Sequence, residues 1–221
     1  MAGTDLRRIT TDPRLAGLDL RHVEITPGPS CAFTLTYDAT GHLTGTQSSF
    51  GVAASLTAHA LNVLGSLSAC HVCCRRPLDA AAILGPLAVL GIPFSVDFHL
   101  ARASAFMAAA KPALPAAQAV FVNAAEFAIL ARVTDPGSLQ TVVVSDGPAP
   151  AMVLRHGQQV ASAVPPATTV TEVTGAGDTL TGTFLAACAR GLDCQAALAE
   201  AVTAASRAVS RPGLSIPTAG G

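Results

Sequence analysis

The sequence predicts an α/β fold in which a mostly parallel β-sheet is flanked by helices, with a small β-hairpin attached. Short apolar segments bounded by glycine, proline or polar residues alternate with Ala-rich segments of helical length over most of the chain. This alternation is typical of successive strand–helix–strand units, which build parallel sheets with helices on both faces. No internal repeat is visible. A single domain is therefore expected over residues 1–221, with a hairpin over residues 29–47.

The N-terminal part of the chain favours this hairpin and then a helix. Ser30–Tyr37 partly alternates apolar and polar residues, and Asp38–Gly41 has the composition of a turn. His42–Thr46 follows as the expected second strand. Ala53–Val63 shows helical spacing with few helix-breaking residues, so a helix is expected there.

The rest of the chain shows the alternation itself. Apolar runs predict strands at Ala69–Cys74, Phe94–Phe98, Ala119–Val122 and Thr141–Val144. The intervening and following segments predict helices at Leu78–Leu90, Ala101–Ala110, Ala124–Ala131, Thr179–Ala189 and Gln195–Ser210. A small hairpin is expected from Ala151–Leu154 and Gln159–Ser162.

The composition excludes several functional classes. Only 12% of the residues are charged and the net charge is −1, so no broad basic surface exists and nucleic acid is not expected as a partner. The long apolar stretches are interrupted by proline and lysine, so neither a membrane span nor a membrane partner is expected. The six cysteines are irregularly spaced, which indicates free thiols and a cytoplasmic location.

The most informative motif is Thr174–Asp178, with the sequence TGAGD. Gly175 and Gly177 remove side chains where a backbone must approach a ligand closely. The segment then opens a helix, whose first N–H groups point outward unpaired and form a hole for an anion. Asp178 would repel a stored phosphate, but it is useful if it takes a proton from a hydroxyl group that attacks phosphorus. The alternative is a plain glycine-rich turn with Asp178 as an N-cap.

Two other polar strand ends are expected beside this motif. Asn123 and Ser145–Gly147 each follow a predicted strand. Because ligands in such sheets bind at the carboxyl ends of the strands, these residues and Gly175–Asp178 are expected to line one edge. The sequence therefore predicts a site that handles phosphate.

Three motifs, in this order, resemble those of the PfkB or ribokinase-like kinases. Phe121–Glu126 (FVNAAE) is similar to the family's Asn-x-x-Glu element, and Thr141–Gly147 (TVVVSDG) to its nucleotide-binding strand and turn. Thr171–Gly182 (TEVTGAGDTLTG) resembles the C-terminal signature, and its Val-Thr-Gly-Ala-Gly-Asp form is similar to the pseudouridine-kinase branch. The resemblance implies a ribokinase-like fold in which the hairpin over residues 29–47 is a lid.

The resemblance implies an ATP-dependent kinase that transfers the γ-phosphoryl group to a hydroxymethyl group of a sugar or nucleoside, of the ribose, fructose or pseudouridine type. Asp178 would be the general base on the acceptor hydroxyl. The backbone of Gly175, Ala176 and Gly177 would stabilise charge on the transferred group. The family also implies a homodimer formed through the lid hairpin.

Nucleotide and metal contacts follow from the same resemblance. Ser145, Gly147 and Thr174 would contact ATP, and Asn123 and Glu126 would organise Mg²⁺ and its waters. Parts of the family also use a monovalent cation, for which the sequence assigns no ligand. The spacing of Asn123 and Glu126 is equally that of a helix capping box, and both interpretations can hold together.

The N-terminus departs from the family pattern. The resemblance begins at about Leu15, and nothing before Asp19 matches the strand, Gly-Gly pair and Asn with which members start. We therefore expect a chain that is N-terminally shortened relative to the family, either as a fragment or mis-started product of a longer member or as a shortened homologue. The alternative function is a catalytically impaired homologue that binds a nucleotide or a partner protein.

Two weaker signals lie between the hairpin and the motifs. Cys70–Cys74 contains a Cys-x-x-Cys spacing, but a zinc site would need a second ligand pair, so a core strand is favoured. Arg75 and Arg76 follow this strand and could meet a phosphate, although exposed arginines are the default interpretation.

Overall fold

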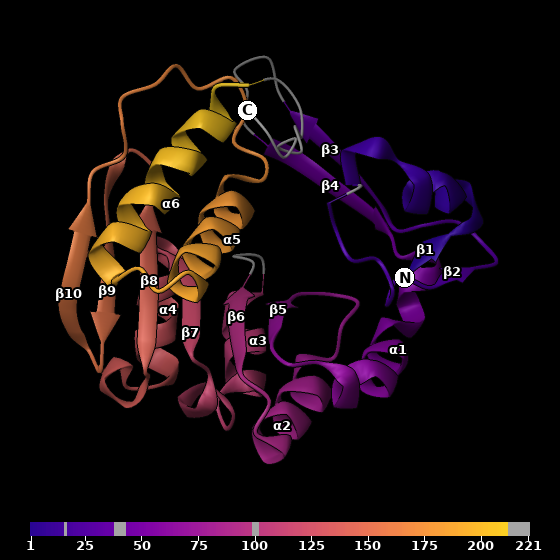
Figure 1. Cartoon of the computed structure of the whole chain (residues 1–221), viewed down its shortest axis with the longest axis horizontal. Coiled ribbons are helices and arrows are strands. Elements are labelled where there is room, and N and C mark those ends of the chain that lie inside the picture. Colours follow the sequence, from indigo (N-terminus) through magenta and orange to yellow (C-terminus); the bar gives the residue numbers. More distant parts are fainter. Residues whose placement is uncertain (16, 38–42, 99–101, 212–221) are drawn as a thin grey trace. The chain divides into compact units, whose positions relative to one another are not determined.

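The computed structural model describes residues 1–15, 17–37, 43–98 and 102–211 (Figure 1). The described residues form two compact units: unit 1 contains residues 1–67 and 76–79, and unit 2 contains residues 68–75 and 80–211. The turn predicted at Asp38–Gly41 and the start of the strand predicted at His42–Thr46 lie outside the described residues. Within the described ranges, no helix is both long and apolar enough to cross a membrane.

Unit 2 is built on a six-stranded sheet with the order β10-β9-β8-β7-β6-β5. Its strands are β5 (Cys70–Cys74), β6 (Phe94–Phe98), β7 (Ala119–Asn123), β8 (Thr141–Asp146), β9 (Ala149–Arg155) and β10 (Gln158–Ala163). The pairs from β5 to β8 are parallel, whereas β9 and β10 add to β8 as an antiparallel hairpin. The predicted α/β fold with a mostly parallel sheet is confirmed.

Helices cover both faces of this sheet. They are α2 (Ala80–Leu90), α3 (Ala103–Ala110), α4 (Ala124–Val133), α5 (Ala176–Ala189) and α6 (Cys194–Val209). Figure 1 shows α5 and α6 over one face and α3 and α4 over the other. Short 3₁₀ turns at Leu114–Ala116 and Pro136–Ser138 precede β7 and β8.

The face of the sheet beneath α5 and α6 is apolar where β7, β8 and β9 form it and polar where β5 and β6 form it. Phe121 of β7, Val143 of β8 and Val153 of β9 are buried in one cluster with Leu180 and Phe184 of α5. The same face of β5 and β6 carries polar residues at alternating positions, because strand side chains alternate between faces. These are His71, Cys73, Ser95 and Asp97. The polar part of this face therefore borders the apolar core and is available for a site.

The strand at Cys70–Cys74 was predicted as a core strand, and here the structure differs. Among the described residues, β5 forms the edge of the six-stranded sheet and pairs only with β6. Val72 and Cys74 are buried on one face, whereas His71 and Cys73 on the other are partly exposed. The apolar run that suggested a core strand is thus buried on one face only.

Unit 1 contains two small sheets and short helices. β1 (Ala2–Gly3) pairs in parallel with β2 (Ile25–Thr26), and β3 (Ala32–Tyr37) pairs antiparallel with β4 (Leu43–Ser49). The helices are α1 (Leu56–Val63) and 3₁₀ segments at Thr4–Thr11, Pro13–Leu15, Gly51–Ser55 and Leu64–Ser66. The predicted helix at Ala53–Val63 is therefore a 3₁₀ turn followed by an α-helix.

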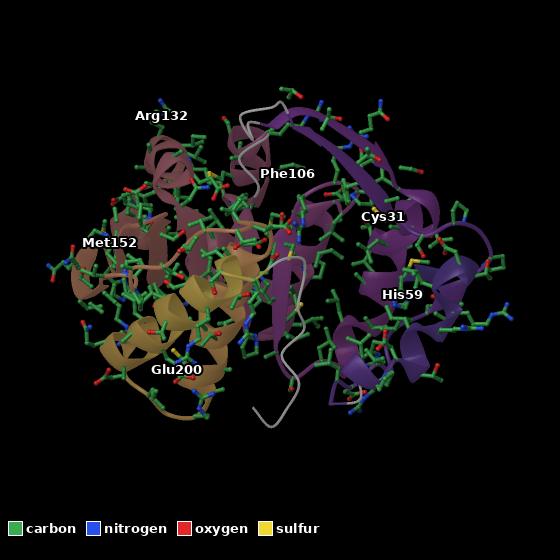
Figure 2. All side chains as sticks on the ribbon, turned by 90° about the horizontal axis from the view of Figure 1, so that it is seen from above. Cys31, His59, Phe106, Arg132, Met152 and Glu200 are labelled. Atoms are coloured by element: carbon green, nitrogen blue, oxygen red, sulfur yellow. The ribbon has the colours of Figure 1, made fainter. Side chains whose placement is uncertain are left out.

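Polar contacts hold unit 1 together. Ser30 Oγ accepts from the Gly3 N–H at 2.7 Å and donates to Asp5 Oδ1 at 2.7 Å. His59 of α1, labelled in Figure 2, pairs with Glu24 at 2.8 Å. These contacts join segments that are distant in the chain.

Candidate functional site

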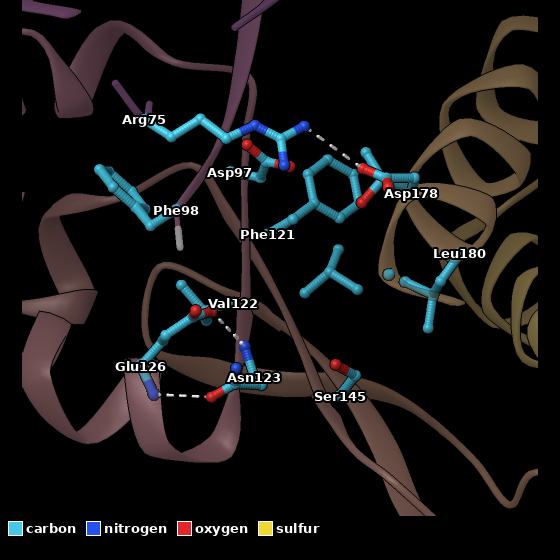
Figure 3. A pocket seen from close by; sticks show the side chains of 13 residues that line it. Arg75, Asp97, Phe98, Phe121, Val122, Asn123, Glu126, Ser145, Asp178 and Leu180 are labelled. Atoms are coloured by element: carbon cyan, nitrogen blue, oxygen red, sulfur yellow. Dashed lines mark hydrogen bonds and ion pairs between the residues drawn. The ribbon is translucent and has the colours of Figure 1, made fainter. Parts of the chain in front are cut away.

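A cavity of about 200 Å³ lies at the carboxyl ends of the parallel strands of unit 2. Its polar lining includes residues from six elements or their ends, several of which are labelled in Figure 3: Arg75, Asp97, Asn123, Glu126, Ser145 and Asp178. Phe121 and Leu180 form part of its apolar wall. The cavity thus occupies the sheet edge at which the sequence placed the phosphate-handling site.

The first turn of α5 forms one wall of the cavity. Gly175 is the N-cap residue with φ +80°, a left-handed conformation that glycine adopts without strain. The preceding segment is anchored to the end of α6, because the Val209 carbonyl accepts from the N–H groups of Thr171 at 2.7 Å and Glu172 at 3.1 Å. This anchoring fixes where α5 begins, and it places Gly177 and Asp178 on the cavity wall.

The N–H groups of this turn differ in whether they already donate to an acceptor within the protein. The Ala176 N–H donates to the Val173 carbonyl at 3.2 Å. The N–H groups of Gly177 and Asp178 belong to the first helical turn, which has no acceptors within the helix. An anion in the cavity would therefore be bound chiefly by these two groups and by the positive end of the helix dipole.

Arg75 faces Asp178 across the cavity (Figure 3). Arg75 Nη2 lies 3.9 Å from Asp178 Oδ1, and the two side chains are 48% and 64% exposed. Partial burial lowers the pKa of Arg75, but the charges of Cys73, Asp97 and Asp178 outweigh it and raise the pKa overall. A fixed positive charge therefore stands beside the carboxylate that the sequence predicts as the base.

Asn123 and Glu126 form a capping box at the start of α4. Asn123 Oδ1 accepts from the Glu126 N–H at 2.9 Å, and Glu126 Oε2 accepts from the Asn123 N–H at 3.0 Å. Glu126 is only 5% exposed, yet it lines the cavity together with Asn123. The structural interpretation of this pair is confirmed. Capping does not by itself exclude a second role, because a carboxylate or amide oxygen can accept more than one contact.

A second polar group continues from the cavity along β5 and β6. His71 Nδ1 lies 2.8 Å from Ser95 Oγ, and Asp97 is next to Cys73 in the pairing of the two strands. Burial lowers the pKa of His71, but interactions with Asp97 and Cys73 more than offset this and raise it to about 9. Asp97 belongs both to this group and to the cavity wall.

The structure brings together five of the residues predicted from the sequence. Asn123, Glu126, Ser145, Gly177 and Asp178 all line the cavity. Four other predicted residues are described but are not among those that line the cavity: Gly147, Thr174, Gly175 and Ala176.

Sequence reasoning missed two charged members of the cavity. Arg75 was interpreted as an exposed arginine, and Asp97 was not considered as a site residue. Each lies at the carboxyl end of a parallel strand, which is the signal that could have identified them.

Comparisons with known proteins agree with this geometry. The family model described as pfkB family carbohydrate kinase matches residues 95–219, more than half of the chain. The comparison with curated proteins gave no match. Arg75 lies outside the segment that the family model matches.

Solved structures with the same fold include three kinases. A nucleoside kinase from Burkholderia thailandensis, in complex with inosine, is 19% identical with a TM-score of 0.77, and the match covers 98% of this chain and 76% of that one. A ribokinase from Thermotoga maritima is 18% identical with a TM-score of 0.76, over 98% and 76% of the two chains. An adenosine kinase from Anopheles gambiae is 15% identical with a TM-score of 0.73, over 96% and 72%. At these identities the likeness shows the ribokinase-like fold.

Proposed function

Because the chain belongs to the pfkB family of carbohydrate kinases, we propose that it transfers the γ-phosphoryl group of ATP to a hydroxymethyl group of a sugar or nucleoside. Asp178 is the general base in this proposal. The observation that carries it is the meeting of Asp178, the first turn of α5 and the Asn123–Glu126 pair in one cavity. The inosine complex of the Burkholderia enzyme and the likeness to a ribokinase support nucleosides and pentoses as the first acceptors to test.

The proposed reaction uses groups that the cavity wall already presents. A carboxylate oxygen of Asp178 takes the proton of the acceptor hydroxyl, and the hydroxyl oxygen forms a bond to the γ-phosphorus. The bond between that phosphorus and the bridging oxygen breaks, and ADP leaves with the electron pair. The N–H groups of Gly177 and Asp178 offset the charge on the transferred group. Arg75 adds a positive charge on the same side.

The charge of the cavity supports a divalent cation beside ATP. Three carboxylates line it, from Asp97, Glu126 and Asp178, against the single guanidinium of Arg75 among the described lining residues. This excess of negative charge would repel a triphosphate unless a cation accompanies it. Asn123 and Glu126 offer the oxygen donors that Mg²⁺ prefers, so the residues present fit the ion. Bound Mg²⁺ would neutralise charge on the phosphates.

The size of the cavity supports a small reacting group. A volume of about 200 Å³ is below the roughly 300–1,000 Å³ typical of sites that enclose a whole ligand. It therefore holds the reacting hydroxymethyl and phosphoryl groups, while the rest of ATP extends beyond it. Nucleotide contacts are proposed for Ser145, which lines the cavity, and for Gly147 and Thr174 beside it.

The base is tested with Asp178→Asn in an assay of ADP release that depends on the acceptor. Purified protein is incubated with Mg²⁺-ATP and pooled ribose, fructose, inosine, adenosine and pseudouridine. Turnover is expected to fall by about 10²–10⁴-fold, because the amide cannot accept the proton. The matched control is Asp193→Asn, which removes a carboxylate at the N-cap of α6 and keeps a good capping residue.

Two results would contradict the proposal. Unchanged turnover in Asp178→Asn would remove Asp178 as the base. Absence of acceptor-dependent ADP release from folded wild-type protein that still binds Mg²⁺-ATP would favour the nucleotide-binding alternative.

The metal role of Glu126 is separated from its capping role by Glu126→Gln. Glutamine also completes a capping box at this position, so the free energy of unfolding should change little. If Glu126 helps to hold Mg²⁺, the Mg²⁺ concentration that gives half-maximal turnover should rise about tenfold or more. An unchanged Mg²⁺ dependence would leave Glu126 with the capping role alone. Asn123→Ser, which keeps a capping residue, provides the companion measurement.

We further propose that the β3–β4 hairpin acts as the lid and as a dimer contact. Its support is that the hairpin forms a sheet of its own, with Phe33 56% exposed. Sedimentation of the wild type and Phe33→Ser tests the dimer, which should weaken in the variant.

The six free thiols and the proposed use of ATP support a cytoplasmic location.

A further inference from the structure

Three residues with metal-binding side chains converge on the polar part of the sheet face beneath α5 and α6. His71 and Cys73 are two positions apart on β5, so their side chains lie on the same face. Asp97 of β6 is the direct partner of Cys73 in the parallel register. The pairing of two strands therefore creates a cluster that neither strand carries alone.

The distances within the cluster suit one shared ion. A ring nitrogen of His71, Cys73 Sγ and a carboxylate oxygen of Asp97 all lie within 4.8 Å of one another. His71 Nε2 and Asp97 Oδ2 are 3.8 Å apart, which is too long for a hydrogen bond. Ligand atoms on one tetrahedral zinc ion are about 3.3–3.8 Å apart, given bonds of about 2.0–2.3 Å. Rotations that move these atoms by about 1 Å or less would close the cluster around a metal.

The imidazole of His71 is already oriented for this role. Its Nδ1 lies 2.8 Å from Ser95 Oγ, and Ser95 is only 4% exposed. With the Nδ1–H donating to Ser95, Nε2 faces Asp97 and becomes a ligand atom once the metal displaces its proton. Metal-binding histidines are usually oriented in this way by a partner on the other ring nitrogen. The ring also packs edge-on against Phe121, with centroids 5.9 Å apart.

The charges and the donor atoms of His71, Cys73 and Asp97 indicate which class of metal ion the cluster would bind. A Cys73 thiolate and the Asp97 carboxylate would bring two negative charges, which match a divalent cation, and the ion would displace the proton of His71. The guanidinium of Arg75 interacts with Cys73 and Asp97 as well as with Asp178, so its positive charge is shared among three groups rather than fixed on the cluster. A set of one imidazole, one thiolate and one carboxylate is typical of zinc and neighbouring transition metals, rather than of Mg²⁺.

We propose that His71, Cys73 and Asp97 form a site for a divalent transition-metal ion of the zinc class, with its fourth coordination position open to solvent. Asp97 also lines the cavity that holds Asp178, so the ion would sit on the wall of that cavity. Three protein ligands and one open position are the arrangement of exchangeable zinc sites. The site is distinct from the Asn123–Glu126 pair proposed for Mg²⁺. Its test does not depend on kinase activity.

Cobalt and zinc titrations of the full chain test the site. Protein treated with a chelator is titrated with Co²⁺ under reducing conditions, and absorbance is recorded in the near-ultraviolet and visible regions. One equivalent of Co²⁺ is expected to give a thiolate-to-cobalt charge-transfer band, together with the visible bands of tetrahedral cobalt. One equivalent of Zn²⁺ should then remove both, because zinc binds such sites more tightly.

Variants assign the ligands. Cys73→Ser should abolish the charge-transfer band, and His71→Gln should weaken Co²⁺ binding by at least about tenfold. Ser95→Ala should weaken it by about 10–100-fold through loss of ring orientation. Cys70→Ser is the matched control, because Cys70 is on the same strand but faces the opposite side of the sheet. Circular dichroism confirms that each variant is folded.

The proposal is overturned by either of two results. One is the absence of stoichiometric Co²⁺ or Zn²⁺ binding by the folded wild type. The other is a charge-transfer band that persists in Cys73→Ser or disappears in Cys70→Ser. Should Cys73→Ser fail to fold, the His71→Gln and Ser95→Ala titrations decide the question, since unchanged affinity in both would also overturn it.

Discussion

Arg75 and Asp178 form an ion pair on the wall of the cavity. The pair matters for the charge of the site and adds little to the stability of the fold. Both side chains are about half exposed or more, and the closest charged atoms are 3.9 Å apart. Exposed pairs of this kind contribute about 0–1 kcal/mol to folding. The pair does, however, hold the carboxylate of Asp178 toward the cavity and keeps a positive charge beside it.

Arg75→Gln is therefore expected to impair turnover more than stability. We expect kcat/KM for the phosphoryl acceptor to fall about tenfold, equivalent to about 1.4 kcal/mol, because Asp178 loses its partner and the cavity loses its positive charge. The midpoint of urea unfolding should change little. Steady-state kinetics and urea titrations measure the two effects.

The control for this prediction is Arg190→Gln. Arg190 makes a similar exposed pair with Glu200 of α6, labelled in Figure 2, and it lies outside the cavity. Equal losses of activity in the two variants would show that the Arg75 effect is not specific to the site.

Among the helices, α5 begins with two glycines, Gly175 and Gly177, and the structure explains only the first of them by backbone conformation. Gly175 is the N-cap residue with φ +80°, where a side chain would be strained. Gly177 lies within the helix, and a Cβ built there would meet no atom within 4 Å. The fold therefore requires glycine at the first position but not at the second.

Alanine at each position separates folding from function. Gly175→Ala should destabilise the protein by about 1 kcal/mol or more. Gly177→Ala should stabilise it by about 0.5–1 kcal/mol, since alanine is the better helix former. Its turnover should nevertheless fall, because the new methyl group stands where the transferred phosphoryl group approaches the backbone.

Urea unfolding and acceptor-dependent ADP release measure these variants side by side. Gly182→Ala is the control, because Gly182 lies later in α5, is not among the residues that line the cavity, and also has open space around it. A stabilised Gly177→Ala protein with full turnover would argue against close approach of phosphate to this backbone.

At the level of the whole chain, each of the two units is stabilised internally by a different kind of contact. Unit 2 has a continuous apolar core between its sheet and helices. Unit 1 relies more on polar contacts such as the one between Asp5 and Ser30, in which the Ser30 N–H also donates to Asp5 Oδ1 at 3.0 Å. Polar contacts that involve a carboxylate depend on pH, so the units should respond differently to acid.

Unit 1 is expected to lose protection first as the pH falls. The hydrogen bond from the Ser30 hydroxyl lowers the pKa of Asp5, and backbone hydrogen bonds add to the effect. A carboxyl whose pKa is lowered by folding stabilises the folded state above its ordinary value of 3.8, and this contribution is lost as the pH falls below that value. Hydrogen exchange measured between pH 3 and 6 should show that the amides of residues 1–30 lose protection as the pH falls.

Asp5→Asn serves as the test of the cause. It removes the titrating group, so unit 1 should be less protected at pH 6 and should lose little further protection in acid. Asp135→Asn, at an N-cap in unit 2, should leave the exchange of residues 1–30 unchanged. If unit 1 of the Asp5→Asn variant still loses protection in acid, groups other than Asp5 cause the acid sensitivity.

Most elements of unit 2, and five of the residues that line the cavity, could be predicted from local sequence patterns. Phe94–Phe98 was predicted with the bounds that the structure has, because a buried apolar run between Pro93 and polar residues has few alternatives. The helix predicted at Thr179–Ala189 begins three residues earlier, at Ala176, because the helix starts within the TGAGD motif directly after the left-handed N-cap residue Gly175. Asn123 and Glu126 were identified by a local spacing that also forms the capping box.

Only the tertiary structure decided which residues from different strands meet. The pairing of Ala2–Gly3 with Ile25–Thr26, the Arg75–Asp178 ion pair and the cluster of His71, Cys73 and Asp97 all join segments whose proximity no local pattern encodes. Strand register sets these contacts, and register follows from the packing of the whole sheet against its helices. The sequence thus predicted part of the group that lines the sheet edge, and the fold added Arg75 and Asp97 and set which of these residues are neighbours.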